Sequence, residues 1–336
     1  MNITHSATSV LLLCLWGCAS PPPPPATPFT AKDPLVAVST LINAPSPSNP
    51  WDDDLMVRLQ ESLVKEKRDS RYRTASEEQG KNLLLLNEIE HLLPSWFGEQ
   101  QSGQERSVER VLIIKVVTQF DVILDAFQNG PRERRIVAAW ALGFSRVPEN
   151  RLSIPSPHGR ALSALADGLN TTDDILMNNI LLGLWKLGDH RAPVQLLQEI
   201  MVRHHDVAVR ANAALALQAC LDQYQARQAV SDIMTALQDR EAKVRLHAAG
   251  IAKRFPHPSL TAQIENLLPQ EPLPLVRASM ATALGSSGSR TSGSVLINLM
   301  SNGTAVEKKA AQIALIQIFK TDEGPNPQAW RDRYGS

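Results

Sequence analysis

The sequence lacks an excess of charge of either sign, and this absence excludes two classes of partner. Its 336 residues include 34 Lys and Arg and 34 Asp and Glu, so the formal net charge is zero. A nucleic-acid binder needs a basic stripe that displaces phosphate counterions. A protein that binds an anionic membrane surface through its charge needs a polybasic segment. We therefore expect no nucleic-acid partner and no electrostatic attachment to lipid headgroups.

Cysteine and aromatic residues are also scarce. Three cysteines are too few for a disulfide-rich scaffold. Aromatic residues make up only 5% of the chain, and segments in which β-branched and polar residues alternate are rare. A barrel or a sandwich needs such segments, so the composition predicts an all-α fold.

Proline is concentrated in one segment near the N-terminus. Ten of the 23 prolines lie between residues 21 and 50. Each proline ring fixes φ and removes a backbone donor, so a segment this rich in proline forms neither a helix nor a central strand. We interpret residues 18–50 as an extended tether and expect the folded part to begin near Trp51.

The longest apolar run near the N-terminus, SVLLLCLWG at 9–17, has nine residues. A membrane-spanning helix needs about 20, whereas a run of this length is typical of the central region of a signal peptide. The run ends in LWGC at 15–18, which resembles the lipobox of bacterial lipoproteins. The resemblance implies a signal peptide at 1–17 and an acylated Cys18 that attaches the chain to a membrane. A plain secretory signal, or an uncleaved leader with an incidental cysteine, is the alternative.

The same resemblance carries a prediction of location. Ala19 follows the cysteine, where lipoproteins retained at an inner membrane commonly have Asp. We therefore expect a lipid-anchored protein of the cell envelope, at the outer membrane and facing the periplasm. Removal of 1–17 takes Cys14 away, and acylation uses Cys18, which leaves Cys220 without a disulfide partner. Cys220 follows a run of alanines, so we interpret it as a small buried apolar residue.

A short motif recurs six times along the rest of the chain. Its clearest copies read VRANAALAL at 209–217 and VRASMATAL at 276–284. Measured at the Arg position, the copies are separated by 31 to 42 residues. The six positions are Arg135, Met177, Arg210, Arg245, Arg277 and Lys308. A repeat of this period predicts an array of stacked structural units, which we place at 129–320.

Each unit contains two predicted helices. In the first, small residues lie on one face, so a neighbouring helix can approach closely. After a turn, a second amphipathic segment follows, as at Ala226–Gln238. Upstream, 51–128 is interpreted as an N-terminal helical cap or degenerate repeats, with helices at Asp52–Lys65, Gly80–Leu93 and Gln104–Gln128. Residues 321–336 are interpreted as a C-terminal cap in which Trp330 covers the last repeat, because a solenoid needs polar caps at its ends.

The pattern D-x-[DE]-x-x-V-R-x-x-A-A-x-A-L resembles the HEAT repeat, particularly the short form named after phycobilisome lyases. The resemblance implies a right-handed α-α superhelix of the armadillo and HEAT type. It also implies that the Asp and Arg positions bond within and between repeats, and that the second helices line a concave face. The positions that match are Asp206, Arg210, Asp239, Arg245 and Arg277.

Motifs that carry catalytic chemistry are absent from the sequence. It contains no Gly-rich phosphate loop after a strand and no GxSxG, HExxH or CxxC motif. We therefore expect no enzymatic activity, no cofactor and no small-molecule substrate. His204 and His205, followed by Asp206, are the one group with metal-ligand chemistry. Adjacent residues on a helix point about 100° apart, so we interpret them as exposed turn residues and predict no metal site.

The function predicted from the repeats is that of a protein-binding scaffold in the cell envelope. Solenoids bind partners along their concave face, and the polar residues predicted there carry little net charge. An uncharged or mildly basic protein surface would fit them. The residues expected to contact the partner are Arg227, Gln228, Ser231, Asp232, Gln263 and Glu265. Two alternatives remain open: an enzyme-accessory or bilin-lyase-like protein, and a structural element that binds peptidoglycan.

Overall fold

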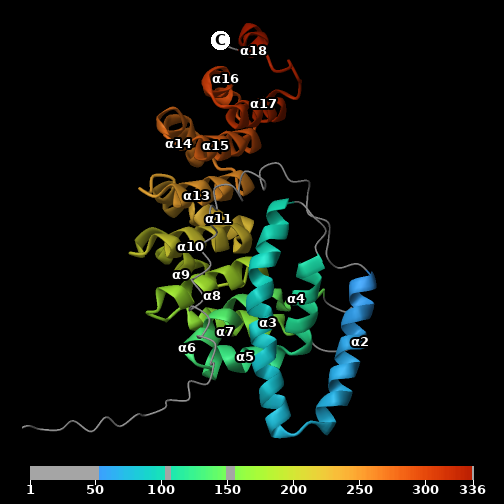
Figure 1. Cartoon of the computed structure of the whole chain (residues 1–336). Coiled ribbons are helices and arrows are strands. Elements are labelled where there is room, and N and C mark those ends of the chain that lie inside the picture. The colour runs from blue at the N-terminus through green and yellow to red at the C-terminus, as the bar shows by residue number, and fades with distance from the viewer. Residues whose placement is uncertain (1–52, 103–106, 149–155, 335–336) are drawn as a thin grey trace, which may run out of the picture.

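The computed structural model describes residues 53–102, 107–148 and 156–334, without the side chains of 97–102. Within these ranges the elements are 17 α-helices and four short 3₁₀ segments, and there is no strand. The all-α solenoid predicted from the sequence is confirmed (Figure 1). The predicted signal peptide, Cys18 and the tether lie outside the described residues.

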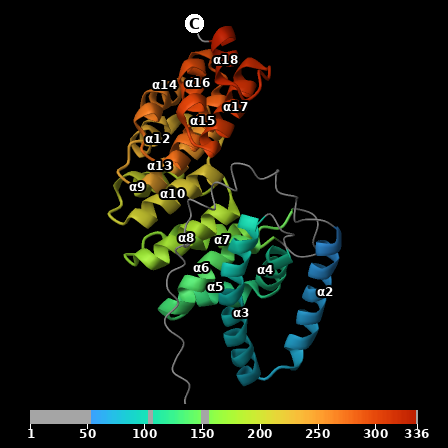
Figure 2. The ribbon, with the colours of Figure 1, turned by 45° about the horizontal axis from the view of Figure 1, so that its top comes forward.

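Two long helices begin the described part of the chain. They are α2 (Asp53–Asp69) and α3 (Ala75–Ser102), which are joined through the 3₁₀ segment Ser70–Tyr72, and α4 (Ser107–Thr118) packs against both of them (Figures 1 and 2). The prediction that the second of these helices ends at Pro94 is wrong, because α3 continues through this residue. Leu93 and Trp96, which flank the proline, are 4% and 2% exposed. Burial of these two side chains stabilises the continuous helix although Pro94 has no backbone N–H to donate.

The predicted helix at Gln104–Gln128 is two helices. They are α4 (Ser107–Thr118) and α5 (Phe120–Asn129), with Gln119 between them at φ −113° and ψ 29°. Phe120 and Phe127 of α5 are 6% and 3% exposed. The apolar run continues through the break, so hydrophobicity alone did not reveal the change of direction.

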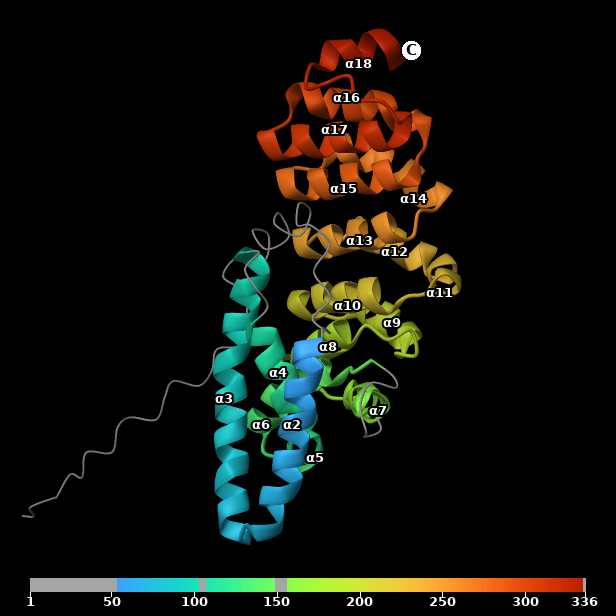
Figure 3. The same cartoon turned by 90° about the vertical axis from the view of Figure 1, so that its right-hand side faces the viewer.

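Two layers of helices form the solenoid. Figure 3 shows α10, α13 and α15 stacked in one column, with α9, α12 and α14 beside them. The first helices of the repeats are α6 (Arg132–Ala141), α8 (Asp174–Leu187), α10 (Val207–Cys220), α13 (Ala242–Arg254), α15 (Pro274–Ser287) and α17 (Ala305–Phe319). The second helices are α7 (His158–Gly168), α9 (Val194–Arg203), α11 (Gln223–Gln228) with α12 (Val230–Ala236), α14 (Pro258–Leu267) and α16 (Gly293–Asn302).

Small residues let the first helices approach backbone to backbone. A Cβ atom on Gly183 of α8 would lie 2.4 Å from the carbonyl oxygen of Ala139 in α6. A Cβ atom on Gly285 of α15 would lie 2.7 Å from the Cα atom of Ala314 in α17. The alanine pairs of the motif are fully buried, as at 213–214 and 248–249. The repeated small residues therefore set the spacing of the stack.

The predicted second helix at Ala226–Gln238 differs from the structure. It begins earlier and is split at Ala229 into α11 and α12. The earlier start comes from a capping box, in which Asp222 accepts a hydrogen bond from the N–H of Gln225 and the Gln225 side chain accepts one from the N–H of Asp222. The prediction overlooked this signal.

The C-terminal segment folds back on the last repeat as α18 (Pro327–Tyr334). Trp330 is fully buried, and its Nε1 donates a hydrogen bond to the carbonyl oxygen of Gly324 at 2.9 Å. The rings of Phe319 and Tyr334 stack beside it, with centroids 3.9 Å apart. None of the helices in the described part of the chain is long and apolar enough to cross a membrane.

Candidate functional site

The motif arginines join successive repeats. Arg210 of α10 donates from Nε and Nη2 to the carboxylate of Asp239, at 2.9 and 3.0 Å. Its Nη1 donates to the carbonyl oxygens of His204 and His205, at 2.9 and 3.2 Å. The side chain is only 6% exposed. One arginine thus fixes the turn that enters its own helix and the turn that enters the next repeat.

The next two arginines repeat this arrangement. Arg245 pairs with Glu271 at 2.7 and 2.8 Å and also binds the carbonyl oxygens five and six residues before it. Arg277 pairs with Glu307 and likewise binds the carbonyl oxygens five and six residues before it. We call these three arginines and their carboxylate partners Asp239, Glu271 and Glu307 the arginine ladder.

Asp206 bonds within its own repeat, as the resemblance implies. It is the N-cap of α10, and its Oδ1 accepts a hydrogen bond from the N–H of Val209 at 2.9 Å. The carboxylates of Glu271 and Glu307 were not predicted. Glu271 could have been found, because it lies six residues before Arg277 as Asp239 lies six before Arg245.

The ladder favours the charged forms of Arg210, Arg245 and Glu307. Hydrogen bonds with the carboxylates of Asp239 and Glu271 raise the pKa of Arg210 and of Arg245 above the usual value. Burial alone would raise the pKa of Glu307, but hydrogen bonds from Arg277 and Thr304 outweigh burial and lower it. These groups are bonded within the stack, so the ladder is a structural element and not a binding site.

The residues predicted to contact a partner fall into two groups. Gln263 and Glu265 of α14 make contacts within the chain. Gln263 Nε2 donates to the carbonyl oxygen of Met234 at 2.9 Å, and Glu265 accepts from the hydroxyls of Thr291 and Ser292 at 2.8 and 2.6 Å. The Nε2 atom of Gln263 and the carboxylate of Glu265 connect α14 to its neighbours, so these two residues are partly used within the fold.

The other four residues lie on α11 and at the start of α12. Arg227, Gln228 and Ser231 are exposed, and Asp232 is half-buried. Sequence analysis missed a fifth residue, Tyr224, which is 69% exposed. It lies three and four residues before Arg227 and Gln228, so the three side chains share one face of α11.

We call Tyr224, Arg227, Gln228 and Ser231 the α11 patch. Tyrosine and arginine are enriched among residues that dominate the energy of protein interfaces. The tyrosine could have been found from the capping box at Asp222, because that signal starts the helix before Tyr224. The patch can offer an aromatic surface, a bidentate donor and an amide to a partner.

Cys220 has no nucleophilic character. It is 1% exposed and donates a weak hydrogen bond to the carbonyl oxygen of Leu184 at 3.5 Å. Burial raises the pKa of its thiol to about 12. The thiolate, which is the reactive form, is therefore not populated near neutral pH.

Paired helices in two layers, joined by the ladder, define an α-solenoid. Residues 230–316, from α12 into α17, match the family model of HEAT repeats. Among solved structures, the chain is similar to human deoxyhypusine hydroxylase in complex with glycerol, with 14% identity and a TM-score of 0.33. The match covers 72% of this chain and 99% of that one. None of the curated proteins matches this sequence.

Proposed function

We propose that the protein is a non-enzymatic scaffold that binds a protein partner through the α11 patch. The observation that carries this proposal is that some polar side chains of the second helices bond within the fold, whereas others are exposed to solvent. Those of Gln263 and Glu265 are used inside the fold, whereas Tyr224 and Arg227 extend into solvent with no bonding partner among the described residues. HEAT repeats supply the extended helical surface on which such a patch can serve as a docking point.

The composition of the patch indicates the chemistry of the partner. The exposed members carry one positive charge, and Asp232 beside them carries one negative charge. A partner surface with little net charge therefore meets no strong repulsion there. The ring of Tyr224 supplies most of the apolar area, so we expect a small apolar recess on the partner that receives this ring.

Photo-crosslinking in living cells tests this function. A photoreactive residue at position 227 should give a discrete crosslinked product with one partner protein. The matched control is position 253, because Lys253 is an exposed basic residue on α13, a first helix of the next repeat. No product at position 227, or the same products at both positions, would show that the α11 patch is not the binding surface.

We further propose that the scaffold is anchored to a membrane of the cell envelope by an acylated Cys18. The support is in the sequence: an apolar run of nine residues before Gly17 and Cys18, and a proline-rich segment after them. A polyproline segment rises about 3.1 Å per residue, so a tether of this length would hold the repeats tens of Å from the bilayer. The outer membrane, facing the periplasm, is the proposed location.

Replacing Cys18 by alanine tests the anchor. The variant should lose labelling by a fatty-acid analogue and move from the membrane fraction to the soluble fraction. Cys14→Ala is the matched control, because Cys14 lies inside the apolar run and should be removed with it. Retention of Cys18→Ala in the membrane fraction would contradict the proposed acylation.

A further inference from the structure

The layer formed by α8 and α10 lacks both the arginine and the carboxylate that the arginine ladder has in the later layers. Between α8 and α10, Met177 stands where the neighbouring repeats have an arginine. His204 stands six residues before Arg210, where Asp239 and Glu271 stand before the next two arginines. Met177 is 6% exposed, so it contributes only apolar packing. The arginine–carboxylate pair of the three later layers is replaced here by a group of different chemistry.

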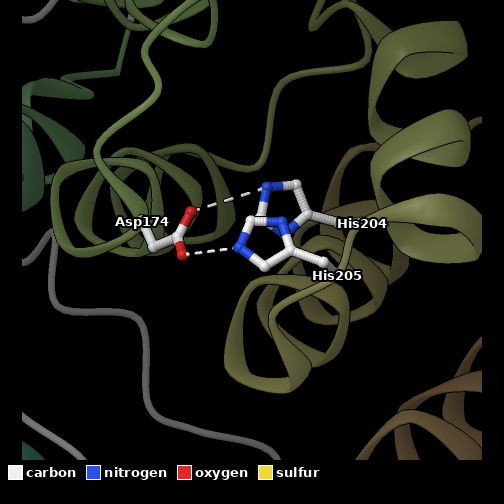
Figure 4. A group of neighbouring side chains, drawn as sticks. All are labelled: Asp174, His204 and His205. Carbon is white, nitrogen blue, oxygen red and sulfur yellow. Dashed lines mark hydrogen bonds and ion pairs between the residues drawn. The ribbon is translucent and has the colours of Figure 1, made fainter.

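This group consists of Asp174, His204 and His205 (Figure 4). The Nε2 atom of His205 lies 3.0 Å from Oδ2 of Asp174, and the Nε2 atom of His204 lies 3.7 Å from Oδ1. One nitrogen from each ring and one carboxylate oxygen all lie within 4.8 Å of one another. Figure 4 shows both Nε2 atoms turned toward the carboxylate.

The two histidines lie in a turn, as predicted, and His205 is exposed, but the prediction that their side chains diverge is wrong. That prediction takes both residues to open a helix, whereas His204 is the C-cap of α9 with φ −64° and ψ 140°, and His205 lies in the turn before α10. In this extended backbone the two rings come together instead of pointing about 100° apart. Their centroids are 4.5 Å apart and the planes are inclined by 29°.

The surrounding hydrogen bonds fix the backbone of all three residues. Arg210 Nη1 binds the carbonyl oxygens of both histidines. On the other side, Asp173 caps α8 by accepting from the N–H groups of Ile175 and Leu176, which sets the position of Asp174 in the first turn. The backbone from which the three side chains project is therefore held by the fold.

We propose that Asp174, His204 and His205 form a zinc-binding site. Zinc binds imidazole nitrogen and carboxylate oxygen at about 2.0–2.2 Å. A tetrahedral arrangement at this radius separates neighbouring ligand atoms by about 3.3 Å. In this structure one nitrogen of each ring and one carboxylate oxygen lie within 4.8 Å of one another, so a modest movement of the side chains would bring them to that spacing. Two nitrogen donors disfavour Mg²⁺ and Ca²⁺, which take oxygen ligands.

The fourth position of the tetrahedron faces solvent. The side chain of His205 is 78% exposed and that of Asp174 is 33% exposed, whereas that of His204 is 16% exposed. Three protein ligands with one open position let water, or a side chain of a bound protein, complete the coordination. The ion would join α8 to the α9–α10 turn and thereby take over the linking role that the arginine ladder has in the later layers.

Zinc binding at His204 requires one proton to move. The Nδ1 atom accepts a hydrogen bond from the N–H of Asp206 at 3.2 Å. The neutral ring therefore carries its proton on Nε2, facing Asp174. When zinc binds Nε2, this proton moves to Nδ1, and the Asp206 amide loses its acceptor. No net proton is released from this ring, and the Asp206 amide becomes a local reporter of binding.

Titration of Zn²⁺ into the purified full chain at about pH 7.5 tests the site, because the ligand groups must be deprotonated to bind the metal. The wild type should bind one equivalent of Zn²⁺. The variants His205→Ala and Asp174→Asn should bind this equivalent with an affinity at least about tenfold lower. His91→Ala is the matched control, because His91 is an exposed histidine on α3 and should leave binding unchanged. Every variant keeps the same cysteines, so any zinc that they hold cancels in the comparison.

Two spectroscopic readouts separate binding at this site from a change in folding. Co²⁺ in the same site should give the strong visible absorption of a four-coordinate ion, and His205→Ala should lack it. In NMR spectra, Zn²⁺ should shift the amide signal of Asp206 in the wild type. Equal Zn²⁺ binding by wild type and His205→Ala, or no binding by the wild type at millimolar Zn²⁺, would overturn the proposal.

Discussion

Replacing Arg245 by alanine is expected to lower the free energy of unfolding by about 3 to 5 kcal/mol. The guanidinium makes two hydrogen bonds to the carboxylate of Glu271, whose side chain is only 3% exposed. It also binds the carbonyl oxygens of Asp239 and Arg240. Without it, the buried carboxylate keeps only the N–H of Leu273 as a donor, and two carbonyl groups lose the guanidinium. Urea unfolding of the wild type and the variant measures the difference.

Arg240→Ala is the control for this prediction. Arg240 lies five residues before Arg245, and its side chain is exposed, although its carbonyl oxygen takes part in the ladder. Its removal should change the free energy of unfolding by no more than about 0.5 kcal/mol. In the double variant Arg245→Met with Glu271→Leu, much of the lost stability should return, because no unpaired charge remains. Equal effects of Arg245→Ala and Arg240→Ala would show that the ladder does not stabilise the stack.

The second large effect is expected at the C-terminal cap. Replacing Trp330 by alanine should weaken the attachment of α18 by about 3 to 5 kcal/mol, as for other buried aromatic side chains. The indole is fully buried, bonds to Gly324 and packs near Phe319 and Tyr334. Units of a solenoid contact mainly their neighbours, so the loss should remain local. Hydrogen exchange should accelerate in α16 and α18 but not in α8 and α10.

A substitution on the same helix controls for this effect. Asp332 of α18 is exposed. The variant Asp332→Ala should change the free energy of opening that hydrogen exchange measures in α16 by no more than about 0.5 kcal/mol, as expected for a surface substitution. Unchanged exchange in α16 and α18 of the Trp330→Ala variant would contradict the assignment of α18 as a packed cap. Acceleration throughout the chain would contradict a local role for it.

The repeat made most of the solenoid predictable from sequence. The small residues of the motif predicted close packing of first helices, and Ala213, Ala214, Ala248 and Ala249 are fully buried in that layer. The recurring Arg predicted contacts between repeats, and Arg210 bonds to Asp239 of the next repeat. These features follow from the periodicity of the motif, which can be recognised even where single residues of a copy differ.

The differences arose where local geometry, not periodicity, decides the outcome. Pro94 usually ends a helix, but buried Leu93 and Trp96 on either side keep α3 continuous. The break at Ala229 lies inside a continuous amphipathic pattern, which carries no signal for a change of axis.

The candidate sites were less predictable than the fold. Gln263 and Glu265 have the same polar character as the exposed residues of α11, and only the positions of Met234, Thr291 and Ser292 show that they are used internally. The site at His204 depends on an extended backbone at one residue and on Asp174, thirty residues upstream. Residue types alone do not bring such groups together.

The affinity of the crosslinked partner for the purified chain tests the scaffold function most directly. Tyr224→Ala and Arg227→Ala should each weaken binding about 30-fold or more, which corresponds to the 2 kcal/mol typical of dominant interface residues. Lys253→Ala, on a first helix, should leave the affinity unchanged. If the three variants bind the partner as tightly as the wild type, the α11 patch is not the docking surface and the proposed function is wrong.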